Sequence, residues 1–285
     1  MPVPPAAIPE WCMSAPRNEL LHGRVALEVR HGLAHVRLAR PDKYNGLDWD
    51  MLRGLVAAAG RLRRDRSVRA VILHGEGPAF SSGLDFGSFG KQPLRAVRGF
   101  LKWGRSTNLF QEAAWCWRRL PQPVIAALHG RCYGGALQIA LAADFRIAAP
   151  DCECSIMEVK WGLIPDMTGT VTLRELVPID VAKRLSMSGR PFSGAEAKAL
   201  NLVTEVADDP LAAAEALAAE LMQRSPDAVA AAKRLFQRSW LAGARRAFAI
   251  ESGLQLRLLR GANQRIALRA NFARQQPDFK PRAFD

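Results

Sequence analysis

Residues 123–148 read PVIAALHGRCYGGALQIALAADFRIA, and this stretch decides the fold. Its apolar run VIAAL, residues 124–128, has the length of a buried strand. Glycine-rich residues 129–135 then form a turn, and Gly134 and Gly135 open a predicted helix with the sequence ALQIALAADF. The first N–H groups of a helix have no partner within it, so this turn is expected to present free backbone donors.

A second glycine-rich turn follows an earlier buried strand. The run VRAVIL, residues 68–73, leads into a glycine-rich loop that contains FSSGLD, residues 80–85. Two such turns can aim two N–H groups at one oxygen, an arrangement that stabilises negative charge on a carbonyl oxygen. Considered alone, the glycines favour a simpler role, the tight packing of strands against helices.

The rest of the chain alternates strands and helices and then becomes helical, which predicts an α/β fold. The predicted elements are a hairpin over 24–38, a helix over 48–65 capped by Asp48, a helical region over 94–119, a strand pair at 146–148 and 155–159, and helices from 168 onward. The predicted organisation is an extended lead-in at 1–20, an α/β core at 21–205 and a helical C-terminal region at 206–285.

Composition indicates which kinds of ligand the protein would bind and in which cellular compartment it would be found. The net charge of +13 favours polyanionic ligands, although an arginine cluster at 61–69 is typical of a solvated helix end. The five cysteines fit no disulfide framework, which predicts reduced thiols in a cytoplasmic protein. No apolar stretch reaches 18 residues, so we expect no membrane span.

Several common chemistries lack their motifs. The sequence has no P-loop, no G-x-S-x-G elbow and no dinucleotide-binding fingerprint. Its five histidines show no pairing on a helix that would suit a metal ion. We therefore expect neither a metal nor a nicotinamide cofactor.

Longer segments make the pattern specific. LARPDKYNGLDWDM (38–51), AVILHGEGPAFSSGLDF (70–86), the stretch at 123–148 and MEVKWGLIPDMTGT (157–170) resemble, in order and spacing, the crotonase (enoyl-CoA hydratase/isomerase) superfamily. The resemblance covers nearly the whole chain after about residue 20. It implies a spiral core of repeated ββα units, a helical C-terminal region that forms a homotrimer or a dimer of trimers, and an acyl-CoA thioester substrate. Coenzyme A would be part of that substrate, and no separate cofactor is implied.

The resemblance also assigns binding residues. The oxyanion donors would be the backbone N–H groups of Leu84 and Gly135. Ser82 would lie where the family's main chain contacts the adenine of coenzyme A, and Gly134 would belong to the same substrate site. Lys280 resembles a tail residue that reaches the coenzyme A phosphates of a neighbouring subunit in relatives, although a solvated tail is an equal alternative.

The acid–base residues separate the possible reactions. Hydratases of this family use two glutamates, which align with Gln138 and Glu158. The side chain of Gln138 cannot exchange a proton, so a substrate-binding role is left for it. One carboxylate suits Δ3,Δ2-enoyl-CoA isomerases, so isomerisation is favoured over hydration. Asp166 aligns with a second acid/base of dienoyl-CoA isomerases, or it is the N-cap of a helix starting near Thr168.

Two other classes remain open. One member type of the family binds RNA through a basic helix that aligns with residues 52–66, a partner that we consider improbable here. The change at Gln138 also suits a catalytically silent acyl-CoA binder.

Overall fold

The computed structural model describes residues 17–90, 93–102 and 104–284. Its centre is a seven-stranded sheet in the order β1-β2-β3-β4-β5-β7-β9, and a second sheet pairs β6 with β8. The pairs β1–β2 and β2–β3 are antiparallel, and every later pair is parallel. The strands are Arg17–Leu21 (β1), Val25–Arg30 (β2), Leu33–Leu38 (β3), Ala70–Gly75 (β4), Val124–Leu128 (β5), Arg131–Tyr133 (β6), Phe145–Ala148 (β7), Glu153–Ser155 (β8) and Glu205–Val206 (β9).

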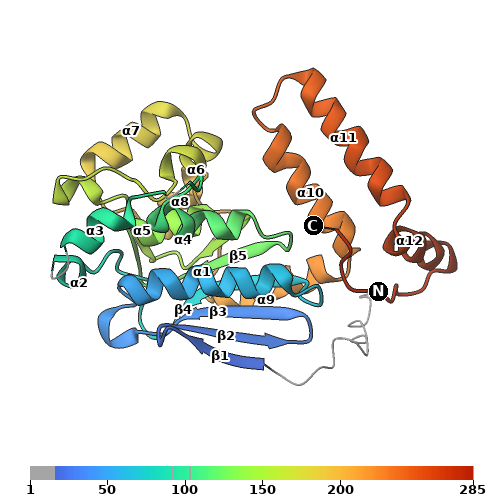
Figure 1. Cartoon of the computed structure of the whole chain (residues 1–285), viewed down its shortest axis with the longest axis horizontal. Helices are drawn as coiled ribbons and strands as arrows, with labels where there is room; N and C mark the ends of the chain where they lie inside the picture. The colour runs from blue at the N-terminus through green and yellow to red at the C-terminus, as the bar shows by residue number, and fades with distance from the viewer. Residues whose placement is uncertain (1–16, 91–92, 103, 285) are drawn as a thin grey trace.

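Helices cover both faces of the main sheet (Figure 1). The described helices are α1 (Trp49–Arg64), α2 (Phe86–Gly90), α3 (Pro93–Gly99), α4 (Leu109–Arg118), α5 (Gly135–Leu141), α6 (Gly169–Leu176), α7 (Ile179–Ser188), α8 (Gly194–Ala199), α9 (Pro210–Met222), α10 (Pro226–Ser239), α11 (Ala244–Leu259) and α12 (Ala262–Ala273), with 3₁₀ helices at Pro41–Lys43 and Glu158–Trp161. Side chains alternate along β4, so Val71 and Leu73 join the core beneath α1 while Ala70 and Ile72 pack with α9.

The units β2–β3–α1 and β5–β6–α5 repeat one pattern of two strands and a helix, which confirms the predicted α/β fold class. The hairpin and the first helix are also confirmed. Asp48 caps α1 as predicted, because its Oδ1 accepts a hydrogen bond from Met51 N–H at 2.8 Å. At the other end of α1, Arg61 forms an ion pair with Glu19 at 2.9 Å.

Three predicted elements differ from the observed ones. The helical region at 94–119 is divided into α3 and α4, because Asn108 and Gln111 form a capping box that starts a new helix. The helix that begins at Gly135 ends at Leu141, since Asp144 N–H already donates to Val124 C=O at 2.9 Å and extends the sheet.

The predicted strand pair at 146–148 and 155–159 is wrong as a pair. β7 joins the main sheet between β5 and β9, whereas β8 pairs with β6 in the small sheet. Residues 158–161 form a 3₁₀ helix instead of a strand. Short apolar runs indicate strands, but they do not say which neighbour each strand will join.

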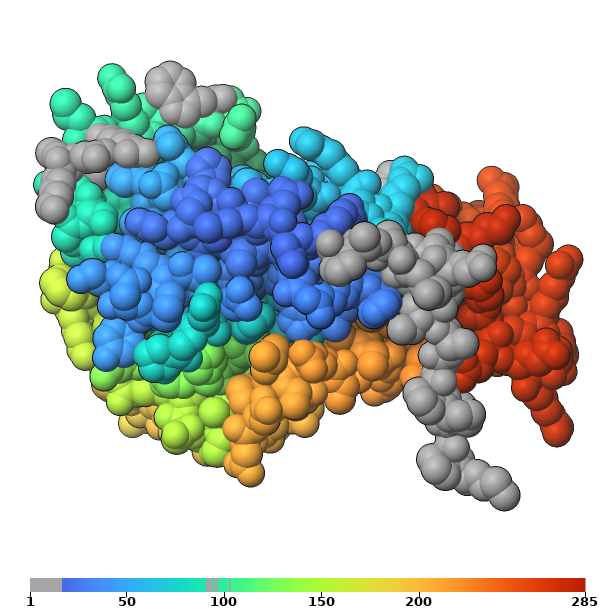
Figure 2. Space-filling model, turned by 90° about the horizontal axis from the view of Figure 1, so that it is seen from below, coloured from blue at the N-terminus to red at the C-terminus, as the bar shows by residue number. Residues whose placement is uncertain are grey.

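The C-terminal part has two kinds of helix. α9 lies against the sheet, whereas α10, α11 and α12 stand apart at one end of the molecule (Figures 1 and 2). Most of the predicted lead-in, residues 1–16, lies outside the described residues, and β1 already pairs with β2 from Arg17 onward. In the part of the chain that the structure describes, no helix is long and apolar enough to cross a membrane.

Candidate active site

The two glycine-rich turns lie side by side. They follow β4 and β5, which are adjacent parallel strands, so both turns leave the same edge of the sheet. Ser81 N–H donates to Arg131 C=O at 2.9 Å, and Tyr133 N–H donates to Ser81 C=O at 3.2 Å. Tertiary pairing therefore brings residues 81–84 and 131–135 together.

The first turn leaves the N–H of Leu84 available. Leu47 forms hydrogen bonds with the residues on either side of Leu84. Its N–H donates to Gly83 C=O at 2.8 Å, and its C=O accepts from Asp85 N–H at 3.1 Å. The Leu84 N–H consequently points away from Leu47, and no acceptor contacts it among the described residues. Gly83 has φ +83°, and a Cβ there would lie 2.7 Å from Tyr133 C=O, so glycine is required for this close approach.

The second turn supplies the other predicted donor. Gly135 is the first residue of α5, so its N–H has no partner within the helix. Gly134 adopts φ 52° and ψ −122°, and its own N–H donates to Ser155 C=O at 2.8 Å. Within the described residues, Leu84 and Gly135 thus both have uncommitted N–H groups on adjacent turns, and their role toward a substrate stays a prediction.

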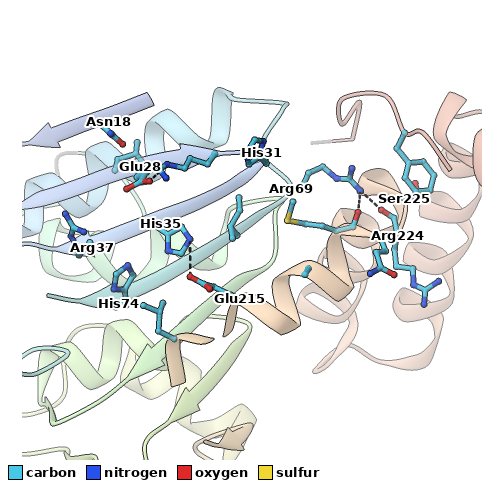
Figure 3. Close-up of a pocket in the computed structure, with 18 of the residues that line it drawn as sticks. Asn18, Glu28, His31, His35, Arg37, Arg69, His74, Glu215, Arg224 and Ser225 are labelled. Atoms are coloured by element: carbon cyan, nitrogen blue, oxygen red, sulfur yellow. Dashed lines mark hydrogen bonds and ion pairs between the residues drawn. The ribbon is translucent and has the colours of Figure 1, made fainter. Parts of the chain in front are cut away.

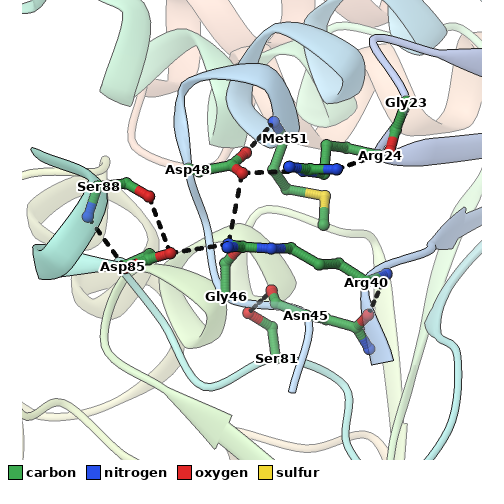
Figure 4. A network of polar contacts seen from close by, with 10 residues as sticks. All are labelled: Gly23, Arg24, Arg40, Asn45, Gly46, Asp48, Met51, Ser81, Asp85 and Ser88. Atoms are coloured by element: carbon green, nitrogen blue, oxygen red, sulfur yellow. Dashed lines mark hydrogen bonds and ion pairs between the residues drawn. The ribbon is translucent and has the colours of Figure 1, made fainter. Parts of the chain in front are cut away.

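A polar network holds the first turn in place (Figure 4). Arg40 Nη1 donates to Asp85 Oδ2 at 2.8 Å and lies 3.4 Å from Asp48 Oδ2. Asp85 also accepts from the N–H and hydroxyl of Ser88, so it acts as a local cap. Burial opposes its ionisation, but the bonds from Arg40 and Ser88 outweigh burial and lower the pKa of Asp85.

Glu158 lies buried beside the second turn. The residue is 6% exposed, and its Oε1 accepts a hydrogen bond from Gln138 Nε2 at 2.5 Å. A Cβ on Gly134 would lie 3.4 Å from the same oxygen, which places the carboxylate against the glycine turn. Burial raises the pKa of Glu158, hydrogen bonding to its own backbone and to Gln138 opposes this rise, and the charge of Asp166 adds to it.

Asp166 is half-buried, and it is not the helix cap. α6 begins at Gly169 with Thr168 in the N-cap position, and no side chain caps it. The alternative of an N-capping Asp166 is therefore wrong. Burial raises the pKa of Asp166, and its electrostatic effect on Glu158 indicates that the two carboxyl groups share one region.

Gln138 connects the two carboxylate segments, a role that sequence reasoning missed. Its Oε1 accepts from Met167 N–H at 2.8 Å and from Gly169 N–H at 3.0 Å. Spacing along the chain gave no sign of these bonds, because α5 and residues 167–169 meet only in the folded molecule.

Ser82 and Lys280 lie in different places. Ser82 belongs to the first turn, where its N–H donates to Tyr44 C=O at 2.8 Å. Lys280 is exposed, and Asn263 binds both its N–H and its C=O. Two residues later, Arg282 N–H donates to Arg66 C=O, and Arg66 precedes the start of β4. The glycine turns follow the opposite ends of β4 and β5. Within a single copy of the chain, Lys280 therefore does not lie near the other predicted site residues.

A large pocket lies elsewhere, over the part of the sheet that α9 leaves uncovered (Figure 3). It has a volume of about 1710 Å³, and none of the predicted site residues lines it. Arg69 crosses one end, where Nη2 donates to the carbonyls of Met222 and Arg224, and His35 lies 3.8 Å from Glu215. This pocket is distinct from the candidate site.

Comparisons with known proteins agree with this geometry. A family model described as enoyl-CoA hydratase/isomerase matches residues 28–282. The chain is 34% identical over 209 residues to a probable enoyl-CoA hydratase of Bacillus subtilis, covering 72% of this chain and 79% of the relative. It is 33% identical over 231 residues to the mitochondrial Δ(3,5)-Δ(2,4)-dienoyl-CoA isomerase of Homo sapiens, covering 77% and 69%.

A solved structure of a putative enoyl-CoA hydratase from Streptomyces coelicolor superposes with a TM-score of 0.84 at 30% identity, covering 94% of this chain and 98% of that one. The family match spans most of the chain, and the fold agrees with it. The chain therefore belongs to the enoyl-CoA hydratase/isomerase family of the crotonase superfamily.

Proposed function

We propose that this chain binds an enoyl-CoA thioester and isomerises its double bond, with Glu158 as the proton-transferring base. One observation carries the proposal: a buried carboxylate lies against a glycine turn whose next residue has a free N–H. The N–H groups of Leu84 and Gly135 would donate to the thioester oxygen as it gains charge.

The reaction needs only one base. Ionised Glu158 removes a proton from C2 of a 3-enoyl thioester, and the electron pair of the broken C–H bond delocalises into the carbonyl to give a dienolate. Return of that proton to C4 yields the 2-enoyl isomer and restores the carboxylate. No other reactant is consumed.

Gln138 supports isomerisation over hydration. Activation of a water molecule by two glutamates requires a second group that exchanges protons, and a carboxamide does not do so at neutral pH. Asp166 is the second carboxyl group of the region, and its half-buried position suits a dienoyl substrate, in which a second proton transfer takes place.

We also propose that copies of this chain form trimers through the C-terminal helices. Large apolar side chains of these helices are exposed: Trp240 (62%), Phe248 (63%), Leu256 (55%) and Phe272 (83%). Burial against another copy would remove this apolar surface from water. In such an assembly Lys280 would reach the site of a neighbouring subunit. The four described cysteines are free and buried, which supports a reducing, cytoplasmic location.

The test is product analysis. Purified protein is offered 3-enoyl-, 2-enoyl- and 3,5-dienoyl-CoA separately, and the products are identified by mass and by absorbance. We expect conversion of 3-enoyl or 3,5-dienoyl substrates and much slower hydration of 2-enoyl-CoA. Glu158→Gln should lower turnover by about a hundredfold or more, because a general base is lost while the N–H donors remain. Fast hydration, or full activity in this variant, would contradict the proposal.

A further inference from the structure

The side-chain amide of Gln138 is held in one orientation. Its oxygen accepts two backbone N–H groups, from Met167 at 2.8 Å and from Gly169 at 3.0 Å. Only the oxygen of an amide accepts hydrogen bonds, so the NH₂ group must lie at the other end, toward Glu158. Gln138 is 0% exposed, and α5 is buried along its whole length, which prevents the side chain from turning away.

This orientation makes the two oxygens of Glu158 different. Oε1 accepts the N–H of Gln138 at 2.5 Å, so one of its two lone pairs is already occupied. Oε2 is buried and has no hydrogen-bond partner in the described part of the chain. A carboxylate oxygen that accepts from a fixed N–H is a poor place for a proton, whereas the other oxygen is free to receive one.

We propose that Gln138 is a positioning residue that directs the transferred proton to Oε2 of Glu158, so that a single oxygen both removes and returns it. This inference rests on the proposed isomerase function, and it identifies which oxygen of Glu158 takes part in the proton transfer. It also replaces the substrate-binding role that the resemblance suggested for Gln138.

The same amide links the base to the segment that carries Asp166. Its bonds to Met167 and Gly169 hold the residues directly after Asp166 against α5. A Cβ on Gly169 would lie 2.8 Å from Gln138 Oε1, so the glycine allows this contact. Of the ionisable groups described, Asp166 is the one that acts on Glu158 electrostatically, and α5 and Gly134 present only uncharged groups to it.

Gln138→Glu tests this role, because it changes only the end of the side chain that faces Glu158. The new carboxylate keeps one oxygen as acceptor for the two backbone N–H groups and replaces the donating NH₂ with a second oxygen. Two carboxylates at this distance share a proton and titrate as a pair, with one pKa strongly raised. Gln111→Glu is the matched control: it makes the same change in the capping box of α4, away from Glu158.

The expected result is an upward shift of the acidic limb of the kcat–pH profile by about one pH unit or more in Gln138→Glu. At a fixed pH on that limb, kcat should fall by about tenfold, while KM stays within about twofold because the thioester contacts are unchanged. Gln111→Glu should match the parent protein. A parental pH profile in Gln138→Glu, or a change in KM alone, would overturn the proposal.

A second measurement separates this inference from the proposed function. Protein labelled with ¹³C at the glutamate carboxyl groups is titrated by NMR, and the Glu158 signal is assigned by its loss in Glu158→Gln. The signal should titrate at higher pH in Gln138→Glu than in the parent protein. An unchanged titration refutes the role of Gln138 even if the enzyme is active, whereas a shifted titration without turnover of any enoyl-CoA refutes only the isomerase function.

Discussion

Glu158 is a residue whose ionised form the folded protein disfavours. Transfer of a carboxylate from water into a buried site is unfavourable, and hydrogen bonding to its own backbone and to Gln138 offsets only part of this effect. A base with a raised pKa removes a proton from carbon more effectively once it is ionised. The burial that makes Glu158 useful therefore also reduces the stability of the molecule.

The pH dependence of stability follows from that burial. The folded state binds the Glu158 proton more tightly than the unfolded chain does. This group's contribution to the free energy of unfolding is therefore fully present below the unfolded pKa, about 4.3, and is lost as pH rises through the raised folded pKa. Glutamine is neutral at every pH. Glu158→Gln should therefore raise the Tm at pH 8, and this gain should disappear near pH 4.

Thermal unfolding at both pH values checks this expectation. Glu220→Gln is the control, because Glu220 is exposed on α9 and its removal should change the Tm little at either pH. A Glu158→Gln protein that is less stable than the parent at pH 8 would show that the ionised carboxylate is better stabilised than its burial indicates.

At the scale of elements, adjacent parallel strands explain the site. β4 and β5 end together, so the turns that follow them meet, and hydrogen bonds between residues 81 and 131–133 keep them in register. Gly83 is one position where the two turns approach closely, since a Cβ there would contact the Tyr133 carbonyl. The position of the Leu84 N–H thus depends on the glycine that precedes it.

Gly83→Ala should separate the turns. The positive φ and the 2.7 Å contact together are expected to cost about 1–3 kcal/mol of stability. Because the Leu84 N–H would move, kcat should fall by about tenfold or more, as for loss of one oxyanion donor. The measurements are denaturant unfolding and turnover of the best substrate.

Gly60→Ala is the matched control. Gly60 lies within α1, and a Cβ there would meet nothing within 4 Å. Alanine is the better helix former, so this variant should gain about 0.5–1 kcal/mol and keep full activity. If Gly83→Ala were as active as Gly60→Ala, the first turn would not position a catalytic donor.

At the scale of the whole molecule, the C-terminal helices expose many large apolar side chains. α11 has no buried residue within the described chain, and α10–α12 stand apart from the sheet (Figure 1). Their exposed aromatic side chains would be unfavourable in a monomer in water. Assembly of several copies is the arrangement that would cover them.

Replacement of Phe248 and Phe272 by serine tests the proposed trimer. We expect the double variant to run as a smaller species than the parent in size-exclusion chromatography with light scattering, because apolar area that stabilises association is removed. Leu20→Ser is the control, since Leu20 is likewise 62% exposed but belongs to β1 and not to these helices. A monomeric parent protein, or a double variant of unchanged mass, would contradict the assembly.

The sequence by itself determined the local elements and the residue types of the site. Alternation in residues 25–38, the cap at Asp48 and the apolar runs before each glycine turn depend only on neighbours along the chain, so they were predictable. Glu158 and Asp166 became candidates through the resemblance of their segment to the family's sequence pattern.

Only the tertiary structure decided which segments meet. The pairing of β6 with β8 and the bonds that fix Gln138 against Glu158 and Met167 all join residues far apart in sequence. Local patterns carry no information on such contacts, because they arise from packing and from the need of buried polar groups to find partners.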